Sequence, residues 1–389
     1  MYVTRTEYII KKGDTMSNKK IVYYNLDNIE KENAQINLIF GERSNGKSYQ
    51  VKHRKAVNPY LESVKEGITE RKRFMLIRRW KEEIKPEKIE QYFLDVDIYK
   101  LTGGKYNCLS LYKGKIWLSN YDPDSKPQLK RGDYIGYVVA LSTEQTYAGA
   151  SYLDVDNMIF EEFMARGVYL PHEPDKLMNL YSTVDRKRGT TKLWLVGNTI
   201  SRVCPYIEEW GLHEIISEQK QGTIITKDIS TGFYDENGDE EKIKLAIEYC
   251  KSTGTSSHVI GNHKAMLNQG AWQSDPQPHL PLSYNEYDVM FRMVFKYGSF
   301  KFIAEYLFDN VSEYCWYVYP YKGEITDDML VISDEVKLNR HWQRSIYNID
   351  IDNITLKRLL NTFRENNIFY ASDLCGTDFK QAIDFEILR

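Results

Sequence analysis

One stretch of the chain has the residue types and spacing that suit phosphate binding. It runs from Gly41 to Ser48, reads GERSNGKS, matches the pattern GxxxxGK[ST] and follows the apolar run INLIF directly. Its glycines let backbone N–H groups wrap a phosphate chain, Lys47 would reach the β and γ phosphates, and the Ser48 hydroxyl would ligate Mg²⁺. The stretch predicts a site for ATP and Mg²⁺ formed by Gly41, Glu42, Arg43, Ser44, Asn45, Gly46, Lys47 and Ser48.

A pair of acids follows a second apolar run, Met158 to Phe160. An enzyme built on such a phosphate-binding loop needs a carboxylate in the metal shell and a base for the attacking water, usually from the end of a neighbouring strand. We expect Glu161 to be the metal-shell residue, although Asp is more usual there, and Glu162 to polarise the water. The alternative interpretation is a surface pair of glutamates at a strand end.

Two further residues could act on the γ phosphate. Asn198 ends the run LWLVG, where its amide could hold the attacking water or the phosphate. Arg186 lies in the basic turn TVDRKRG, and an arginine that enters a neighbouring subunit's site needs such an exposed loop. A turn asparagine and a solvated cation are the respective alternatives.

Four cations near strand ends are candidates for contact with phosphates of nucleotide or DNA: Arg78, Arg79, Lys81 and Arg166. The alternative, that these four side chains are solvated cations without a phosphate partner, explains their positions at least as well. The net charge of the chain is −3, and residues 284–389 hold 12 basic and 17 acidic residues. A polyanion is therefore expected on the N-terminal part, through local contacts only.

Short apolar runs alternate with longer amphipathic stretches in the first half of the chain. We expect buried parallel strands at Ile36–Phe40, Phe74–Ile77, Tyr137–Leu141, Met158–Phe160 and Leu193–Val196. Helices are expected at Ser48–Tyr60 and Lys176–Thr183, and a hairpin is expected at Tyr106–Leu118. This alternation predicts an α/β fold with a mainly parallel sheet.

The second half is organised differently. From Ser230 to Ser283 the chain is rich in Gly, Ser, Asp and Pro, with one short helical run at Ile243–Cys250, which indicates a linker. Strands are expected at Val289–Phe295, Phe300–Leu307 and Cys315–Tyr319. A helix carrying Leu356, Leu359, Leu360 and Phe363 should follow a cap at Asp352 or Asn353. We thus expect an ATPase domain at 1–231, a linker at 232–283 and a small α+β domain at 284–389.

Composition excludes several other classes of protein. At 389 residues the chain exceeds the roughly 250 to 300 residues at which a single core usually stops growing. Its five cysteines include no CxxC pair, which argues against a zinc or disulfide framework and suits reduced thiols in a cytosol. No apolar run approaches the ~20 residues needed to cross a bilayer, so no membrane association is expected.

The order of these motifs resembles that of a known family, the DNA packaging ATPases (DNA encapsidation proteins) of small tailed bacteriophages of the phi-29 type. The resemblance covers roughly residues 20–210, and the rest of the chain resembles the family only in the order of its expected elements. It rests on Tyr24-Asn25 before Gly41, the loop ending in Gly-Lys-Ser-Tyr, Ile77 to Lys81, the acid pair with Phe163, Thr183-Val184 before Arg186, and Asn198 with Pro205-Tyr206.

The resemblance implies a RecA-like motor of the additional-strand, catalytic-glutamate class. It implies that Glu161 is the Walker B acid, Glu162 the catalytic base, Arg186 a finger acting in the adjacent subunit and Asn198 the sensor. It also implies double-stranded DNA as substrate and a ring of five subunits below the portal (connector) protein, with a scaffolding RNA. Such a protein would reside in the host cytoplasm and transiently on the procapsid portal vertex, and be absent from the mature virion.

The family's C-terminal domain is similar to an RNase H-like nuclease that has lost its metal carboxylates. Asp288, Glu305 and Asp373 remain available for catalysis in this sequence. We therefore expect ATP-driven translocation of viral DNA into a preformed procapsid. The alternatives are a large terminase with an active nuclease, a cellular RecA-like helicase or ATPase, and a nucleotide-binding assembly factor that barely hydrolyses ATP.

Overall fold

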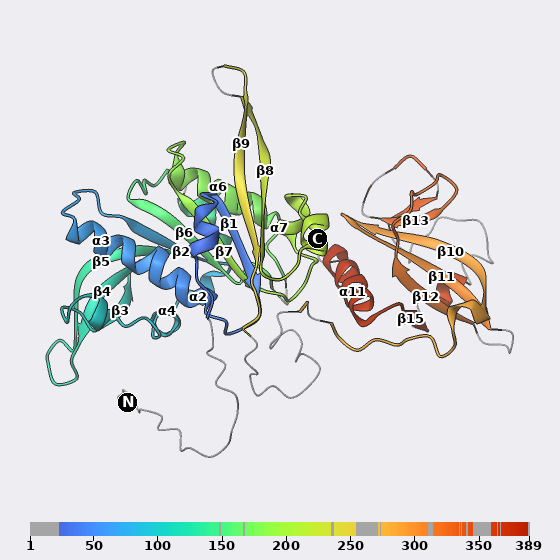
Figure 1. The fold of residues 1–389 in the computed structure, drawn as a ribbon, viewed down its shortest axis with the longest axis horizontal. Helices are drawn as coiled ribbons and strands as arrows, with labels where there is room; N and C mark the ends of the chain where they lie inside the picture. The colour runs from blue at the N-terminus through green and yellow to red at the C-terminus, as the bar shows by residue number, and fades with distance from the viewer. Residues whose placement is uncertain are drawn as a thin grey trace, which may run out of the picture.

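The computed structural model describes residues 23–147, 149–165, 168–234, 237–253, 271–272, 274–309, 314–333, 335, 337–339, 341–344, 359–363, 365 and 367–387. These residues form two sheets, one in each part of the chain (Figure 1). The larger sheet has nine strands and the smaller has six.

The larger sheet has the strand order β3-β4-β5-β2-β6-β7-β1-β9-β8. The six strands from β5 to β9 in this order are parallel, and β3, β4 and β8 add antiparallel hairpins at the two ends. The predicted α/β fold with a mainly parallel sheet is therefore confirmed. The strands are β1 (Ile36–Gly41), β2 (Arg73–Arg78), β3 (Cys108–Tyr112), β4 (Lys115–Tyr121), β5 (Leu129–Ala140), β6 (Val155–Glu161), β7 (Lys192–Asn198), β8 (Thr223–Tyr234) and β9 (Glu240–Tyr249).

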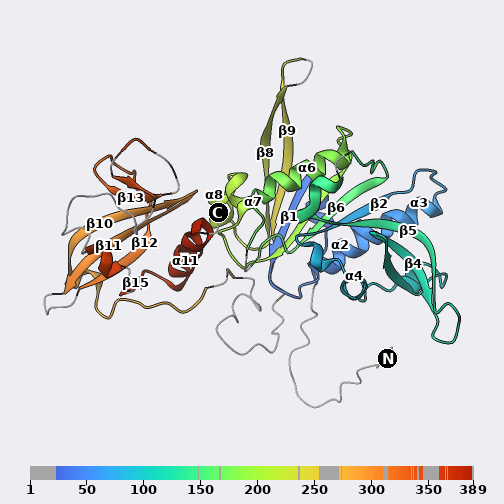
Figure 2. The ribbon, with the colours of Figure 1, turned by 180° about the vertical axis from the view of Figure 1, so that it is seen from behind.

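Helices cover both faces of this sheet, which explains why its central strands are almost continuously apolar. One face carries α2 (Lys47–Val51), the π-helical turn η1 (Lys52–Val57), α3 (Asn58–Lys65) and α4 (Pro86–Tyr92). The other face carries α6 (Glu173–Asp185), α7 (Pro205–Glu209) and α8 (His213–Glu218) (Figure 2). The remaining helical segments of this part are α1 (Asp27–Lys31), η2 (Lys81–Glu83), α5 (Ile98–Leu101) and η3 (Leu141–Tyr147).

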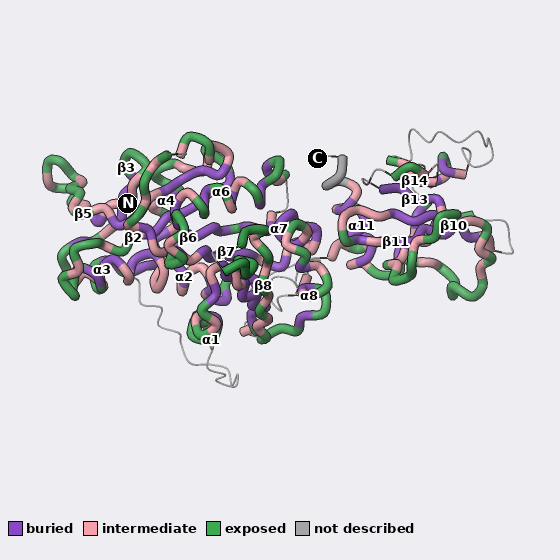
Figure 3. The backbone as a smooth tube through the Cα atoms, turned by 90° about the horizontal axis from the view of Figure 1, so that it is seen from above, coloured by how far each residue is buried: buried purple, intermediate pink, exposed green. Residues whose placement is uncertain are grey.

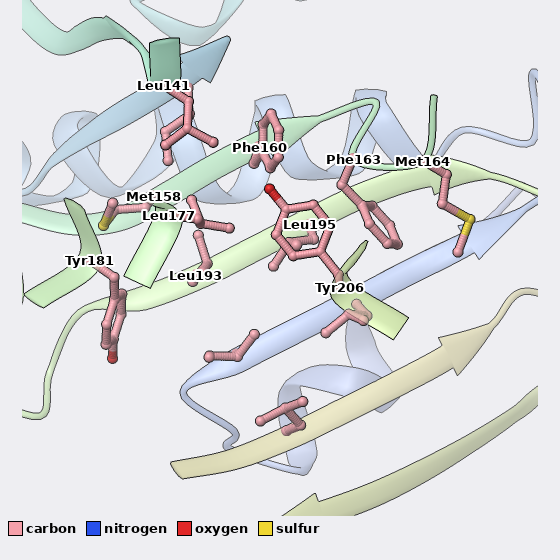
Figure 4. Close-up of a cluster of buried hydrophobic side chains, with 14 of the residues drawn as sticks. Leu141, Met158, Phe160, Phe163, Met164, Leu177, Tyr181, Leu193, Leu195 and Tyr206 are labelled. Carbon is pink, nitrogen blue, oxygen red and sulfur yellow. The ribbon is translucent and has the colours of Figure 1, made fainter. Parts of the chain in front are cut away.

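Strand residues alternate between these two faces, and this alternation sorts the core into two clusters. Phe160 and Leu195 face α6 and pack with Leu177 and Tyr206 (Figure 4). Their sequence neighbours face the helices that follow β1. Seen from above, buried segments gather along β6 and β7 (Figure 3).

The predicted linker was wrong at its beginning. Residues 232–234 belong to β8 and residues 240–249 form β9, so the expected helical turn at Ile243–Cys250 is a strand. The two strands pair with each other, and β9 also pairs in parallel with β1. The hairpin extends well beyond the other strands of the sheet (Figure 1). The larger sheet therefore continues to Tyr249, past the expected domain boundary at residue 231.

The smaller sheet has the order β14-β13-β10-β11-β12-β15. The three expected strands are confirmed as the antiparallel run β10 (Tyr287–Tyr297), β11 (Phe300–Asp309) and β12 (Tyr314–Pro320), preceded by η4 (Tyr284–Glu286). Parallel strands β13 (Leu330–Ser333), β14 (Trp342–Gln343) and β15 (Ile368–Tyr370) extend it, and α11 (Asp373–Ile387) packs on it.

The expected helix near residue 360 is described only from 359 onward. Leu360 and Phe363 are buried in the core under the smaller sheet, as predicted. The expected cap at Asp352 or Asn353 lies outside the described residues.

The segment after β7 contacts the C-terminal part. The Arg202 guanidinium is paired with the Asp378 carboxylate of α11, and the Ser201 hydroxyl donates to Gln381. Val203 packs into the C-terminal core. Among the helices of the described residues, none is long and apolar enough to cross a membrane.

Candidate active site

The phosphate-binding loop connects β1 to α2, as predicted. β1 ends at Gly41 and α2 begins at Lys47 after Gly46, whose φ of 100° is left-handed and favours glycine. A Cβ on Gly41 would lie 2.9 Å from the Cβ of Cys250 at the end of β9. The two glycines of the motif are thus required by backbone conformation at one end and by the close approach of β9 at the other.

Lys47 is buried inside this loop. Its Nζ donates to the carbonyl oxygen of Glu42 at 2.5 Å and to the amide oxygens of Asn45 and Asn198, each at 3.3 Å. Burial lowers the pKa of Lys47, and nearby acidic groups including Glu161 oppose that shift. The structure therefore brings the predicted sensor Asn198 to the predicted phosphate-binding lysine.

The side chains of Ser48 on α2 and Glu161 at the end of β6 are hydrogen-bonded to each other. The Ser48 hydroxyl donates to Glu161 Oε2 at 3.0 Å, and the Tyr92 hydroxyl donates to Glu161 Oε1 at 2.7 Å. Burial raises the pKa of Glu161, and the hydrogen bonds from Tyr92 and Ser48 act in the opposite direction. A hydroxyl and a carboxylate are oxygen ligands of the kind that Mg²⁺ takes, so these residues fit the metal that the motif implies.

The rest of the loop also fits a polyphosphate. Arg43 and Ser44 are exposed, whereas Asn45 is buried and its amide nitrogen has no hydrogen-bond partner in the described structure. A buried donor without a partner is unfavourable unless something supplies an acceptor. Phosphate oxygens would be such acceptors.

Glu42 has a role that the motif does not signal. Its carboxylate is buried and accepts from the Ser252 hydroxyl at 2.7 Å and from the backbone N–H and hydroxyl of Thr253, both at 2.6 Å. The side chain thus ties the segment after β9 to the phosphate-binding loop. Both oxygens of the Glu42 carboxylate thus already accept hydrogen bonds from protein donors, so this side chain is not an open ligand.

Glu162 follows Glu161 but has different surroundings. Its φ of 58° is left-handed, its side chain is exposed, and its backbone N–H donates to the Val196 carbonyl at 2.8 Å. The chain therefore leaves the strand at this residue. The carboxylate is open to solvent at the same edge of the sheet as the phosphate-binding loop.

Arg79 is buried and stabilises the backbone at Glu162 and Phe163. The guanidinium is buried, donates to Glu173 at 2.8 and 2.9 Å and donates to the carbonyls of Glu162 and Phe163. Glu173 also accepts from the Tyr206 hydroxyl at 2.9 Å. This burial corrects the expectation that Arg79 contacts phosphates of nucleotide or DNA, because its donors are already used within the protein.

The other candidate DNA contacts have different outcomes. Lys81 is exposed on η2, where a phosphate could reach it. Arg166 lies outside the described residues. Arg78 is largely enclosed, with its guanidinium over the Tyr92 ring and 3.9 Å from the Glu83 carboxylate.

Arg186 lies at the edge of the sheet where the parallel strands begin, whereas Gly41 lies at the edge where they end. It follows the last residue of α6, has a left-handed φ of 48°, is exposed, and donates from Nη2 to the carbonyl of Ala150 at 2.7 Å. Its neighbour Arg188 donates instead to the carbonyls of Leu153, Val155 and Val184 and holds the turn together. The structure does not bring Arg186 to the phosphate-binding loop of its own chain.

Sequence comparisons place the chain among phage proteins. It is 28% identical over 186 residues to a DNA packaging protein of Bacillus phage B103, an alignment that covers 46% of this chain and 48% of that protein. It is 27% identical over 196 residues to the DNA packaging protein of Bacillus phage phi29, which covers 48% and 49%. The chain spans about half the length of the curated relatives it matches.

A comparison with solved structures covers more of the chain, and a family model also matches the sequence. A chain of the bacteriophage phi-29 viral genome packaging motor assembly superposes with a TM-score of 0.55 at 19% identity, covering 94% of this chain and 99% of that one. At this identity the similarity establishes a shared fold. The model of the Podovirus DNA encapsidation protein (Gp16) family matches residues 18–221, more than half of the sequence. The chain therefore belongs to the Podovirus DNA encapsidation protein family.

Proposed function

We propose that the chain is the ATP-hydrolysing subunit of a motor that moves double-stranded viral DNA into a preformed procapsid. The observation that supports this most directly is the contact between the Ser48 hydroxyl and the Glu161 carboxylate at 3.0 Å, beside Lys47 and Asn198, in a member of this family. This is the arrangement that a phosphate-binding loop and a Walker B acid need to act on ATP.

The chain's residues divide the work of hydrolysis. Lys47 and the loop N–H groups would bind the phosphates, while Ser48 and Glu161 would hold Mg²⁺, which neutralises charge on the β and γ phosphates when bound. Glu162, exposed at the end of β6, would accept a proton from the attacking water. Asn198 is bonded to Lys47 Nζ and would sense whether the lysine has moved onto a phosphate.

Arg186 supports a ring in which neighbouring subunits share sites. β6 runs from Val155 to Glu161, so the two edges of the sheet are separated by about 20 Å at roughly 3.3 Å per residue. A guanidinium at the Val155 end cannot reach a phosphate at the Glu161 end of the same chain. A head-to-tail ring would instead bring Arg186 to the next subunit's nucleotide.

We retain the finer expectations as parts of this proposal. The order β2-β6-β7-β1-β9 puts one strand between the Walker B strand and the loop strand, which supports a RecA-like domain with an additional strand. A homopentameric ring that contacts the portal protein and a scaffolding RNA follows from the resemblance. Its place would be the procapsid portal vertex in the host cytoplasm.

The C-terminal strand order supports an RNase H-like ancestry. Antiparallel β12-β11-β10 followed by parallel β13 and β14 is the pattern of that sheet. Glu305 is fully buried and accepts from Tyr284 and Arg292, and Asp373 is bonded to His279 at 2.9 Å. These two acids are occupied by protein partners on different elements, which supports the vestigial interpretation.

Packaging with purified components tests the proposal. The full chain should package DNA into procapsids only with ATP and Mg²⁺, and its hydrolysis should rise when both procapsids and DNA are present. Hydrolysis indifferent to both would favour a cellular ATPase, and ATP binding without turnover would favour an assembly factor. Cleavage of circular DNA by the full chain with Mg²⁺ would favour a terminase.

A further inference from the structure

We propose that Arg78 binds the terminal phosphate of a nucleoside triphosphate held in its own subunit. This assignment rests on the proposed function of the same site, and it selects a nucleotide phosphate for a residue that the sequence made a candidate for nucleotide or DNA. It would give each subunit a cation that distinguishes ATP from ADP, separate from the arginine contributed by a neighbour.

The fold puts Arg78 next to the metal-shell acid. β2 and β6 are parallel neighbours in which Ile77 pairs with Phe160, so Arg78 and Glu161 are adjacent at the ends of their strands. Side chains alternate along a strand. Leu76 and Ile159 both belong to the cluster under α2 and α3, so Arg78 and Glu161, two residues further on, share this face.

The same alternation separates Arg78 from Arg79. Arg79 turns to the opposite face, where it is paired with the buried Glu173. Two consecutive arginines thus have different surroundings, although the sequence presents them as one basic pair. Only Arg78 is on the side of the phosphate-binding loop.

The guanidinium of Arg78 is incompletely satisfied. Its central carbon lies 5.2 Å from the centre of the Tyr92 ring, whose hydroxyl is bonded to Glu161. Arg78 Nε is buried and has no hydrogen-bond partner in the described structure. The nearest paired carboxylate is that of Glu83, 3.9 Å from Nε and beyond hydrogen-bond distance.

Another cation at the same ring provides a comparison. Lys52 Nζ lies 4.7 Å from the centre of the Tyr92 ring, yet it is fully engaged by Asp95 at 2.5 and 2.6 Å and by the Tyr92 carbonyl at 2.7 Å. One of the two cations at this ring is therefore fully hydrogen-bonded, whereas Arg78 has a buried donor without an acceptor in the described structure. A largely enclosed guanidinium with an open donor indicates an anionic ligand.

The position favours a nucleotide phosphate over a DNA phosphate. Ser48 and Glu161 are the residues that would hold the metal of a bound triphosphate, and Arg78 is one strand away from Glu161 on the same face. Its side chain is only 15% exposed, too enclosed to lie along a duplex backbone. A planar guanidinium can bind two oxygens of one phosphoryl group, and only the triphosphate would place such a group there.

Equilibrium titration with fluorescent ATP and ADP analogues and Mg²⁺ tests this assignment. The full-length chain is compared with Arg78→Ala, all in a Glu162→Gln background that prevents turnover. We expect Arg78→Ala to bind the ATP analogue about tenfold or more weakly, the scale of a lost charge-assisted pair, and the ADP analogue within about twofold of the unsubstituted affinity. Lys88→Ala removes an exposed charge from α4 and should change neither affinity.

Arg78→Lys keeps the protein assayable if the alanine variant does not fold. It retains the charge but not the planar fork, and it should lose part of the preference for ATP over ADP. An equal loss for both nucleotides, or no loss for either, would overturn the assignment, and a loss confined to duplex DNA binding would restore the DNA contact. If the unsubstituted chain bound no ATP, the proposed function would fall together with this inference.

Discussion

Glu161 and Glu162 are neighbours in sequence, but the structure gives them different chemistry. Glu161 is buried on the loop side and bonded by Ser48 and Tyr92, which suits a metal-shell carboxylate. Glu162 has left the strand through a left-handed backbone conformation and is exposed. A carboxylate that must accept a proton from water needs this access to solvent.

This difference predicts separate phenotypes for two substitutions. Glu162→Gln should bind ATP normally and lose about 10²- to 10⁴-fold in turnover, because the amide keeps the shape but cannot accept the proton. Lys47→Ala should lose ATP binding itself. Nucleotide titration and steady-state hydrolysis measure the two effects, and turnover by Glu162→Gln above about a tenth of the unsubstituted rate would require another base.

Arg79 leads to a prediction about stability. Glu173 is fully buried, so removal of the guanidinium would leave its carboxylate without the paired charge. We expect Arg79→Ala to lower the free energy of unfolding by about 3 to 5 kcal/mol, the usual effect of breaking a buried ion pair. Urea unfolding measures the change, exposed Lys81→Ala should stay within about 0.5 kcal/mol, and equal values for the two variants would show that Arg79 is not structural.

At the scale of elements, β9 is the strand that lies beside the phosphate-binding loop, on the β8 side of β1. It pairs with β1 from Ile36 to Phe40, and its end contacts Gly41 through Cys250. Glu248 on this strand accepts a hydrogen bond from Tyr24 at 2.7 Å, while the Tyr24 backbone N–H donates to Asn45 of the loop. β9 and the start of the described chain thus hold the loop from two sides.

Glu248 should make stability depend on pH in a specific direction. Burial raises its pKa from an ordinary value of 4.5 to about 7, and the Tyr24 hydrogen bond opposes that rise. The folded state therefore binds the proton more tightly than the unfolded state, so the Glu248 contribution is fully present below pH ~4.5 and declines as pH rises through about 7.

Glu248→Gln removes this dependence while keeping an acceptor for Tyr24. We expect it to leave the free energy of unfolding nearly unchanged at pH 4 and to raise it at pH 8, by at most about 3.5 kcal/mol at about 1.4 kcal/mol per pKa unit. Denaturant unfolding across this pH range checks the prediction. A stabilisation that is the same at both pH values would contradict the raised pKa.

The strand β9 also illustrates what could be predicted from the sequence. The segment EKIKLAIEY alternates between polar and apolar residues in its first half, as a strand does, but neighbouring loop-like segments suggested a linker. Its assignment depends on pairing with β1, more than 200 residues earlier, which no local pattern reveals. The five apolar runs of the first half were predictable because each is buried on both faces.

At the scale of the whole molecule, the sequence predicted which residues form the site better than it predicted what surrounds them. Lys47, Ser48, Glu161 and Asn198 come together because parallel strands bring their carboxyl ends to one edge. The hydrogen bond from Tyr92 to Glu161 could not be predicted from the sequence, because it depends on how α4 packs against the sheet. The opposite faces of Arg78 and Arg79 were predictable, because consecutive residues at a strand end alternate between the two faces of a sheet.

Under the proposed function, the two edges of the larger sheet carry complementary parts of one reaction. The phosphate-binding loop lies at the edge where Glu161 ends β6, and Arg186 lies at the edge where β6 begins. On this proposal, a complete site would require two subunits, and hydrolysis would be a property of the ring. Arg186→Ala alone should lose on the order of 10³-fold in hydrolysis, the scale of arginine fingers in phosphoryl transfer.

The structure indicates which neighbouring residue is a suitable control for the loss of hydrolysis in Arg186→Ala. Arg188 is unsuitable because its guanidinium holds the turn through several backbone carbonyls, so its removal would disturb folding. Lys187 is exposed next to Arg186 and carries the same charge. Lys187→Ala should retain hydrolysis.

Hydrolysis by mixed rings tests the central claim most directly. An Arg186→Ala subunit has an intact site without a finger, and a Glu162→Gln subunit has an intact finger beside an inactive site. In an equal mixture about a quarter of the interfaces would combine an intact site with an intact finger in a head-to-tail ring, so we predict recovery of roughly that fraction of unsubstituted hydrolysis. If the mixture stayed as inactive as its two components, Arg186 would not act between subunits and the shared site would be contradicted.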